Sequence, residues 1–190
     1  MTRPFLPPRL ARAARRFARG ERGAVSVEAI VMVPVLVAVL LSMAAFWDGM
    51  RARNAALKAA TTVSDAISRE TAPIDAAYVD RMGALYAFLA GADGAASLRI
   101  SVIAGTLDSS GGEALELRWS AVAGPGRAPV VDVNEVARHV PTIAVGDQII
   151  VVESEVEWTP PVRTPLVART FEEVTVARAR FVPQVLWSDG

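Results

Sequence analysis

The chain has 190 residues, a length that suits one domain of ordinary size or a small domain joined to a membrane segment. It has no cysteine, which excludes disulfides, thiolate metal sites and cysteine nucleophiles, and with His139 as the single histidine we expect neither a zinc site nor a Ser-His-Asp triad. Basic and acidic residues number 20 each, but residues 1–23 carry seven arginines and one acid, Glu21, so the formal charge is +6 there and −6 beyond. This asymmetry indicates a membrane or a nucleic acid close to the N-terminal segment.

The segment after the arginines is long and apolar. From Ala29 to Trp47 nineteen residues pass without a charge, and a helix needs about 20 mostly apolar residues to cross a hydrocarbon core of about 30 Å. Arginine-rich segments that flank a membrane span stay in the cytoplasm. The position of the arginines directly before the span therefore explains them better than binding to a nucleic acid would. We therefore expect a basic cytoplasmic leader over 1–23, a transmembrane helix over 24–47 and an extracytoplasmic domain over 48–190.

Two processing schemes fit this arrangement. In the first, residues 1–44 are a secretory signal peptide, with the small residues around Ser42 and Ala44 as the cleavage site. In the second, cleavage precedes the apolar run and leaves it in place as an anchor. The length of the run, and the presence of Glu28 and Pro34 within it, favour the second scheme.

The start of the apolar run contains a spaced glycine and glutamate. The sequence reads Arg22-Gly23-Ala24-Val25-Ser26-Val27-Glu28. A basic leader that ends in glycine, with a glutamate five residues later, resembles the type IV prepilin processing signature. The resemblance implies that a prepilin peptidase cuts after Gly23 on the cytoplasmic side, that Ala24 becomes the first residue, and that Glu28 neutralises the new α-amine of a neighbouring subunit.

Elementary physics gives this spacing a reason. A carboxylate within a membrane helix is costly and tends to find a partner, and near the helix N-terminus it also gains from the helix dipole. The alternative is that Glu28 only reaches out to the membrane surface near Arg22.

The residues from Gly20 to Pro34 resemble the TadE-type family of tight-adherence (Flp) pilus systems, which combine a basic leader, a G-A-x-x-V-E start and a proline six residues after the glutamate. Ala29 departs from the family, which commonly has phenylalanine there. The resemblance implies a minor pilin or pseudopilin of the bacterial inner membrane, single-pass, with its C-terminal domain in the periplasm. It would be a structural subunit rather than an enzyme, without cofactor or small-molecule substrate. Its partners would be the peptidase, other pilin or pseudopilin subunits and the pilus assembly platform.

A membrane-tethered or secreted binding domain unrelated to pili is the alternative function. In either case Pro34 removes the hydrogen bond to the carbonyl of Ile30 and should kink the helix.

Beyond the membrane segment the pattern predicts an α+β domain. The helix continues with an apolar stripe formed by Ala52, Ala56, Ala59, Val63 and Ile67, interrupted at 71–73. A second helix is predicted from Asp75 to Ala90, with Gly91 as its stop and one apolar face. That face consists of Tyr78, Met82, Leu85 and Leu89.

A small antiparallel sheet is predicted next. Alternation over 98–102 and 115–119 indicates two half-buried strands, joined by a loop over 108–112, and a short helix is expected over 133–138. Two further strands, 150–158 and 174–182, flank a proline-rich loop, and the first has one face of glutamates. We expect Glu155 to oppose Arg178 and Glu153 to oppose Arg180 across these strands. This charged face is interpreted either as a solvated surface or as a polar docking surface for another subunit.

Overall fold

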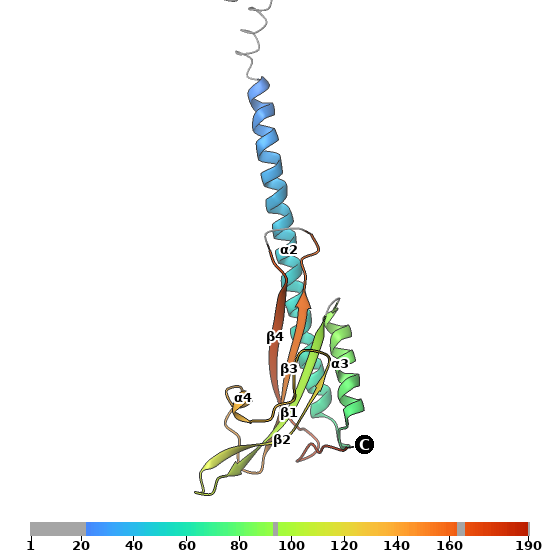
Figure 1. Ribbon diagram of the computed structural model, residues 1–190, viewed down its shortest axis with the longest axis vertical. Coiled ribbons are helices and arrows are strands. Elements are labelled where there is room, and N and C mark those ends of the chain that lie inside the picture. Colours follow the sequence, from blue (N-terminus) through green and yellow to red (C-terminus); the bar gives the residue numbers. More distant parts are fainter. Residues whose placement is uncertain (1–21, 93–94, 163–165, 190) are drawn as a thin grey trace, which may run out of the picture.

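The computed structural model describes residues 22–92, 95–162 and 166–189. Its α+β architecture confirms the predicted fold class: a long helix, a second helix and a four-stranded antiparallel sheet. The long helix stands upright in Figure 1, and the sheet and the second helix gather around its lower half. Of the basic leader predicted over 1–23, residues 1–21 lie outside the described residues.

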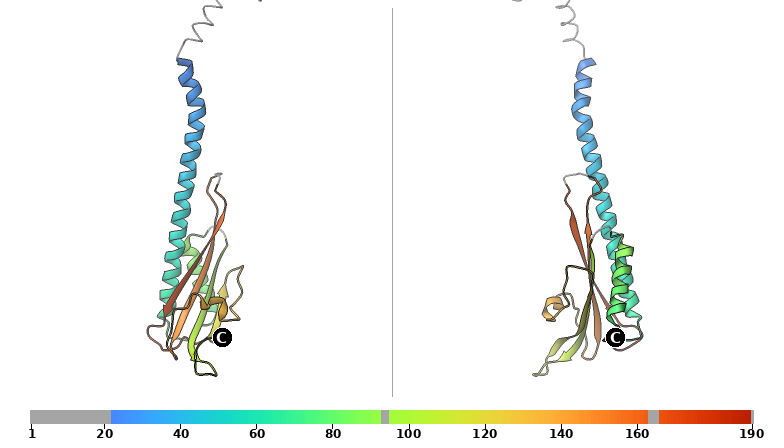
Figure 2. Two further views of the ribbon diagram at one scale, coloured as in Figure 1. Left: turned by 90° about the vertical axis from the view of Figure 1, so that its left-hand side faces the viewer. Right: turned by 45° about the vertical axis from the view of Figure 1, so that its right-hand side comes forward.

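Helix α2 (Arg22–Ser68) has 47 residues and is therefore about 70 Å long at 1.5 Å per residue. Its first half projects beyond the domain, whereas its second half lies along the sheet (Figures 1 and 2). The predicted apolar stripe is confirmed, because Ala56, Ala59, Val63 and Ile67 are fully buried. The alanines leave little bulk between the helix and the strands, so the two layers pack closely.

Helix α3 (Ala76–Ala90) begins and ends where the sequence predicts. The carboxylate of Asp75 accepts a hydrogen bond from the Tyr78 amide over 2.7 Å, and Gly91 adopts the left-handed conformation (φ 64°) that closes the helix. The predicted apolar face is displaced, since Val79, Tyr86 and Ala90 are buried while Leu89 is exposed. The reason is that α3 packs against both α2 and the sheet, so its buried stripe lies between these two neighbours.

The sheet has the strand order β2-β1-β3-β4, and each neighbouring pair is antiparallel. Its strands are β1 (Ala96–Leu107), β2 (Glu113–Ala123), β3 (Gln148–Trp158) and β4 (Arg169–Arg178). Helix α2 lies against β3 and β4, and α3 lies against β1 and β2, so the helices form one layer on one face of the sheet.

The opposite face of the sheet has a smaller apolar cluster, which includes Ile103, Ile149 and Val151. The connection from β2 to β3, with the short helix α4 (Asn134–Ala137), covers this cluster. A bulge in the β1–β2 pairing places Trp119 on the helix-facing side and Leu117 on the other. The alternation over 115–119, which would place both side chains on one face, is therefore interrupted, because the extra residue in the bulge exchanges the faces.

The register of β3 and β4 also differs from the prediction. Glu155 lies opposite Glu172, Glu153 lies opposite Val174, and Arg178 lies opposite Ile149. The displacement is an even number of residues, so every side chain keeps its predicted face although its partner changes. The predicted pairs of Glu155 with Arg178 and of Glu153 with Arg180 do not form.

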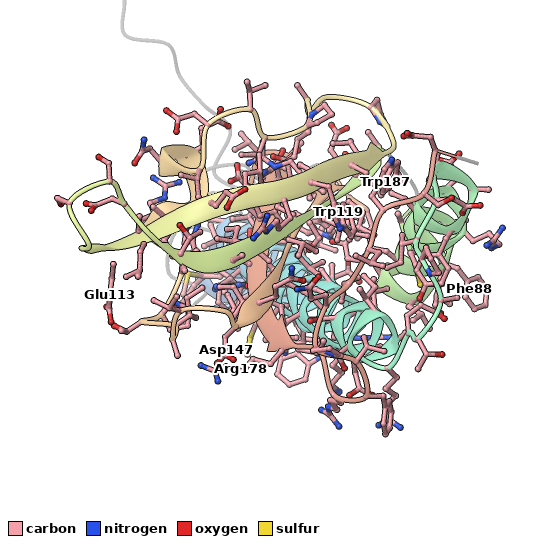
Figure 3. All side chains as sticks on the ribbon, turned by 90° about the horizontal axis from the view of Figure 1, so that it is seen from below. Phe88, Glu113, Trp119, Asp147, Arg178 and Trp187 are labelled. Carbon is pink, nitrogen blue, oxygen red and sulfur yellow. The ribbon has the colours of Figure 1, made fainter. Side chains whose placement is uncertain are left out.

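The C-terminal segment packs against the end of the domain that is distant from the free part of α2. Trp119 donates its indole hydrogen to the carbonyl of Val185 over 2.9 Å. The rings of Trp119 and Trp187 lie 5.2 Å apart, side by side in Figure 3. The backbone of Ile74 exchanges hydrogen bonds with Leu186 and Ser188, which ties the segment to the connection between α2 and α3.

Candidate membrane anchor and processing site

The free part of α2, residues 28–44, is here called the stalk. All of its side chains are exposed except that of Ser42, which is half-buried. Among the described residues, α2 is the one helix that is long and apolar enough to span a membrane. The mean hydropathy of its most apolar stretch is 2.7. A signal sequence near the N-terminus meets the same criteria of length and hydropathy.

Glu28 marks the inner end of the stalk. Its side chain is exposed, and none of the described side chains forms an ion pair or a hydrogen bond with it. Trp47 lies nineteen positions after Glu28, which corresponds to about 28 Å along a helix. This matches a hydrocarbon core of about 30 Å, so Glu28 reaches one edge of a bilayer when Trp47 lies at the other.

Gly23 and Ala24 lie in the first turn of α2, whose backbone the structure describes from Arg22. An α-amine created at Ala24 would lie one turn from Glu28, since residues four apart share a helix face. Gly23, Ala24 and Glu28 are thus together at one helix end.

Pro34 lies within α2, and the helix continues through it without interruption. Because proline has no amide hydrogen, the carbonyl of Ile30 has no helical donor at this point. Membrane helices tolerate such a gap when a neighbouring helix or side chain supplies a donor. The predicted kink stays a prediction.

The stalk ends in a joint with the domain that the sequence did not predict. From Glu28 onward, Ala45 is the first buried residue of α2. Three residues later, Asp48 accepts a hydrogen bond from the indole nitrogen of Trp158, the last residue of β3, over 3.0 Å. Gly49 leaves room for the same ring, since a β-carbon there would lie 3.2 Å from it. The signal that could have indicated this joint is a glycine within a helix, directly after a charged residue that ends the apolar run.

A second contact holds the edge strand to α2. Arg53 pairs with Glu173 on β4 over 3.2 Å, and the rings of Trp158 and Phe171 lie 6.2 Å apart. The upper ends of β3 and β4 are therefore both attached to the first turns of α2 inside the domain.

Two glutamates of β3, Glu153 and Glu155, belong to an ion-pair network. Glu153 is 5% exposed and pairs with Arg99 over 2.6 Å and with Arg127 over 3.3 Å. Arg127 also pairs with Glu155 and Glu172. Burial alone would lower the pKa of Arg127, but the hydrogen bond and charge of Glu155, together with the charges of Glu153 and Glu172, raise it above its ordinary value.

This network corrects the interpretation of the charged face as a solvated surface at Glu153, which is buried and pairs within the chain. Glu157 on the same face is exposed, and the interpretation as a docking surface for another subunit stays a prediction. The sequence analysis did not identify Arg127 as a partner of these glutamates. The signal was available, since three alternating glutamates on one strand require cations nearby once that face is covered.

Among the described residues, no group of three or more histidine, aspartate or glutamate side chains is placed to hold a metal ion. Comparisons of the chain with protein-family models, with curated proteins and with solved structures find no match.

Proposed function

We propose that the chain is a minor pilin-like or pseudopilin-like structural subunit of a tight-adherence (Flp) pilus, held in a bacterial inner membrane by the stalk. The observation that carries the proposal is the division of α2: one half is exposed and apolar, and the other packs on an antiparallel sheet. An apolar surface of this size is unstable in water. A bilayer covers it before assembly, and the helices of other subunits cover it afterwards.

In this proposal the arginine leader stays in the cytoplasm and the domain beyond Trp47 lies in the periplasm. A prepilin peptidase cuts after Gly23, and Ala24 becomes the N-terminus. The carboxylate of Glu28 then neutralises the α-amine of a neighbouring subunit, which lowers the cost of holding either charge near the membrane core. Pro34 kinks the stalk between Glu28 and the domain. The subunit serves assembly and has neither a nucleic acid nor a small molecule as its partner.

A second candidate is a secreted or membrane-tethered binding domain without a pilus. One observation favours it: Ala45, the residue that would follow cleavage after Ala44, is also the first buried residue of α2 from Glu28 onward. Such a cut would remove the stalk and leave intact the helical segment that packs on the sheet.

Two substitutions test the pilin-like function. Gly23→Ala should leave the full-length precursor in the membrane fraction, because the peptidase requires the glycine. Glu28→Ala should permit cleavage but reduce crosslinking between subunits and their release into sheared surface filaments. Glu157→Ala, at an exposed glutamate on β3, is the matched control and should assemble normally. Normal filament incorporation of the Glu28→Ala chain would contradict the proposed pairing with the amine.

A further inference from the structure

A groove lies where the stalk meets the domain. One wall is the outer end of the stalk, with Leu41, and the next turn of α2, with Phe46 and Trp47. The other wall is the segment after β3, with Pro161 and Val162. The groove has a volume of about 730 Å³ and a mostly apolar lining. In Figure 1 the described residues that follow β3 continue upward beside α2. This segment therefore lies next to the base of the stalk.

The depth of the groove follows from the length of the helix. Tryptophan is enriched at membrane interfaces, and Trp47, which is 69% exposed, ends the apolar run. If Trp47 lies at the edge of the hydrocarbon, then Leu41 lies within it and Arg51 lies about 6 Å beyond it. The headgroup layer on one side of a bilayer is about 5–7 Å thick. Arg51 is therefore at the level of the lipid phosphates.

The charges at the rim of the groove are complementary to an anion. Asp48, the one acid in the lining, is already bonded to the indole of Trp158. Arg53 is paired with Glu173, whereas Arg51 has no ion pair among the described side chains and is exposed. An apolar groove with an arginine at its rim fits a phospholipid, with hydrocarbon against the lining and phosphate against the guanidinium.

We propose that this groove is a docking surface for the lipid leaflet on the domain side of the membrane, with anionic phospholipid as its occupant. The proposal rests on the membrane span of the proposed function and adds to it a second contact, made by the domain itself. Because Val162 belongs to a different element from the stalk, contact at two places fixes how the domain is turned relative to the membrane. A single helix would leave the domain free to rotate and tilt.

The absence of cysteine makes the test clean, since each introduced cysteine is unique. Val162→Cys, Leu40→Cys and Leu107→Cys chains are labelled with a nitrobenzoxadiazole fluorophore and reconstituted at full length. The vesicles contain phosphatidylethanolamine and phosphatidylglycerol, with a spin-labelled lipid as quencher. Leu107, at the β1–β2 hairpin, is 57% exposed and Val162 is 39% exposed, so exposure alone favours quenching at the control position. We expect several-fold stronger quenching at 162 than at 107.

Leu40 separates failure of this inference from failure of the proposed function. A label at 40 that is not quenched would contradict the membrane span itself. Quenching at 40, with labels at 162 and 107 equally unquenched, would overturn the docking surface alone. In the Val162→Cys background, quenching should increase when phosphatidylglycerol replaces phosphatidylcholine in the vesicles. Arg51→Gln should abolish this gain, whereas Arg69→Gln, directly after the far end of α2, should retain it. A gain unchanged by Arg51→Gln would contradict the role of the guanidinium.

Discussion

The indole nitrogen of Trp158 donates a hydrogen bond to the carboxylate of Asp48 across 3.0 Å. This contact joins the last residue of β3 to the helix at the point where the stalk leaves the domain. Beside it, Gly49 gives the ring room to lie against α2. The stalk is therefore attached to the sheet as well as being continuous with the domain's helix, so its direction relative to the sheet is fixed at this joint.

Trp158→Phe should test the joint. The substitution removes the donor and leaves the carboxylate of Asp48 without its partner, which should lower the free energy of unfolding by about 1–2 kcal/mol. Trp187→Phe is the control, because that indole bonds to the exposed Asp189 two residues away. Chemical denaturation of the detergent-solubilised chain measures both variants. Equal losses for the two tryptophans would argue against a special role of the Asp48 contact.

Glu153→Gln should be among the most destabilising conservative substitutions in the domain. It leaves the half-buried guanidinium groups of Arg99 and Arg127 without the carboxylate that they share, and breaking a buried pair costs about 3–5 kcal/mol. We expect the lower end of that range, because Arg127 retains Glu155. Glu157→Gln, on an exposed position of the same strand, should change the stability by about 0.5 kcal/mol or less. Similar denaturation midpoints for the two variants would contradict the network.

The turn between β1 and β2 should confer a pH-dependent contribution to stability. Asp108 accepts hydrogen bonds from the Ser110 hydroxyl, the Ser110 amide and the Gly112 amide, and these bonds lower its pKa below the ordinary value. A lowered pKa stabilises the fold above the unfolded pKa of about 3.9, and this contribution is lost as the pH falls through the lower folded value.

Asp108→Asn should therefore be less stable than the parent chain at neutral pH, and the difference should shrink once the pH is below the folded pKa. Thermal unfolding across acidic and neutral pH measures it. A difference that stays constant into strong acid would show that the carboxylate charge is not the source.

Two glycines after β2 provide a matched pair of substitutions. Gly124 (φ 87°) and Gly126 (φ 92°) both have left-handed backbones, so alanine is strained at either, by about 1 kcal/mol. Only at Gly124 would a β-carbon also meet the carbonyl oxygen of Ala96. We expect Gly124→Ala to shift the unfolding midpoint clearly more than Gly126→Ala does. Indistinguishable midpoints would mean that the start of β1 moves away at no cost.

The features that local chemistry determines could be predicted from the sequence. The bounds of α3 follow from the Asp75 cap and the Gly91 stop, since both act within one helical turn. The apolar stripe of α2 follows from its period, because Val63 and Ile67 have only one apolar layer to face. Glu28 lies on the free helix as its spacing from Gly23 and Pro34 implies.

Features that depend on contacts distant in sequence could not be predicted. Cross-strand charge pairs contribute only about 0.2–1 kcal/mol each, which is too little to fix the register of β3 and β4 against side-chain burial. Alternation also cannot distinguish registers that differ by an even number of residues. The bulge at Trp119 and the ion pair between Arg127 and Glu153 both depend on which loop covers the face of the sheet opposite the helices. The Asp48–Trp158 bond joins residues 110 positions apart.

The central claim is that the mature chain begins at Ala24 after processing and retains the stalk as a membrane helix. Mass spectrometry of the N-terminal peptide of the chain, purified from membranes of a cell that carries a prepilin peptidase, tests it most directly. We predict a mature N-terminus at Ala24, with the stalk intact and Glu28 as the fifth residue. A mature chain that begins at Ala45, or a precursor that still begins at Met1, would contradict the claim.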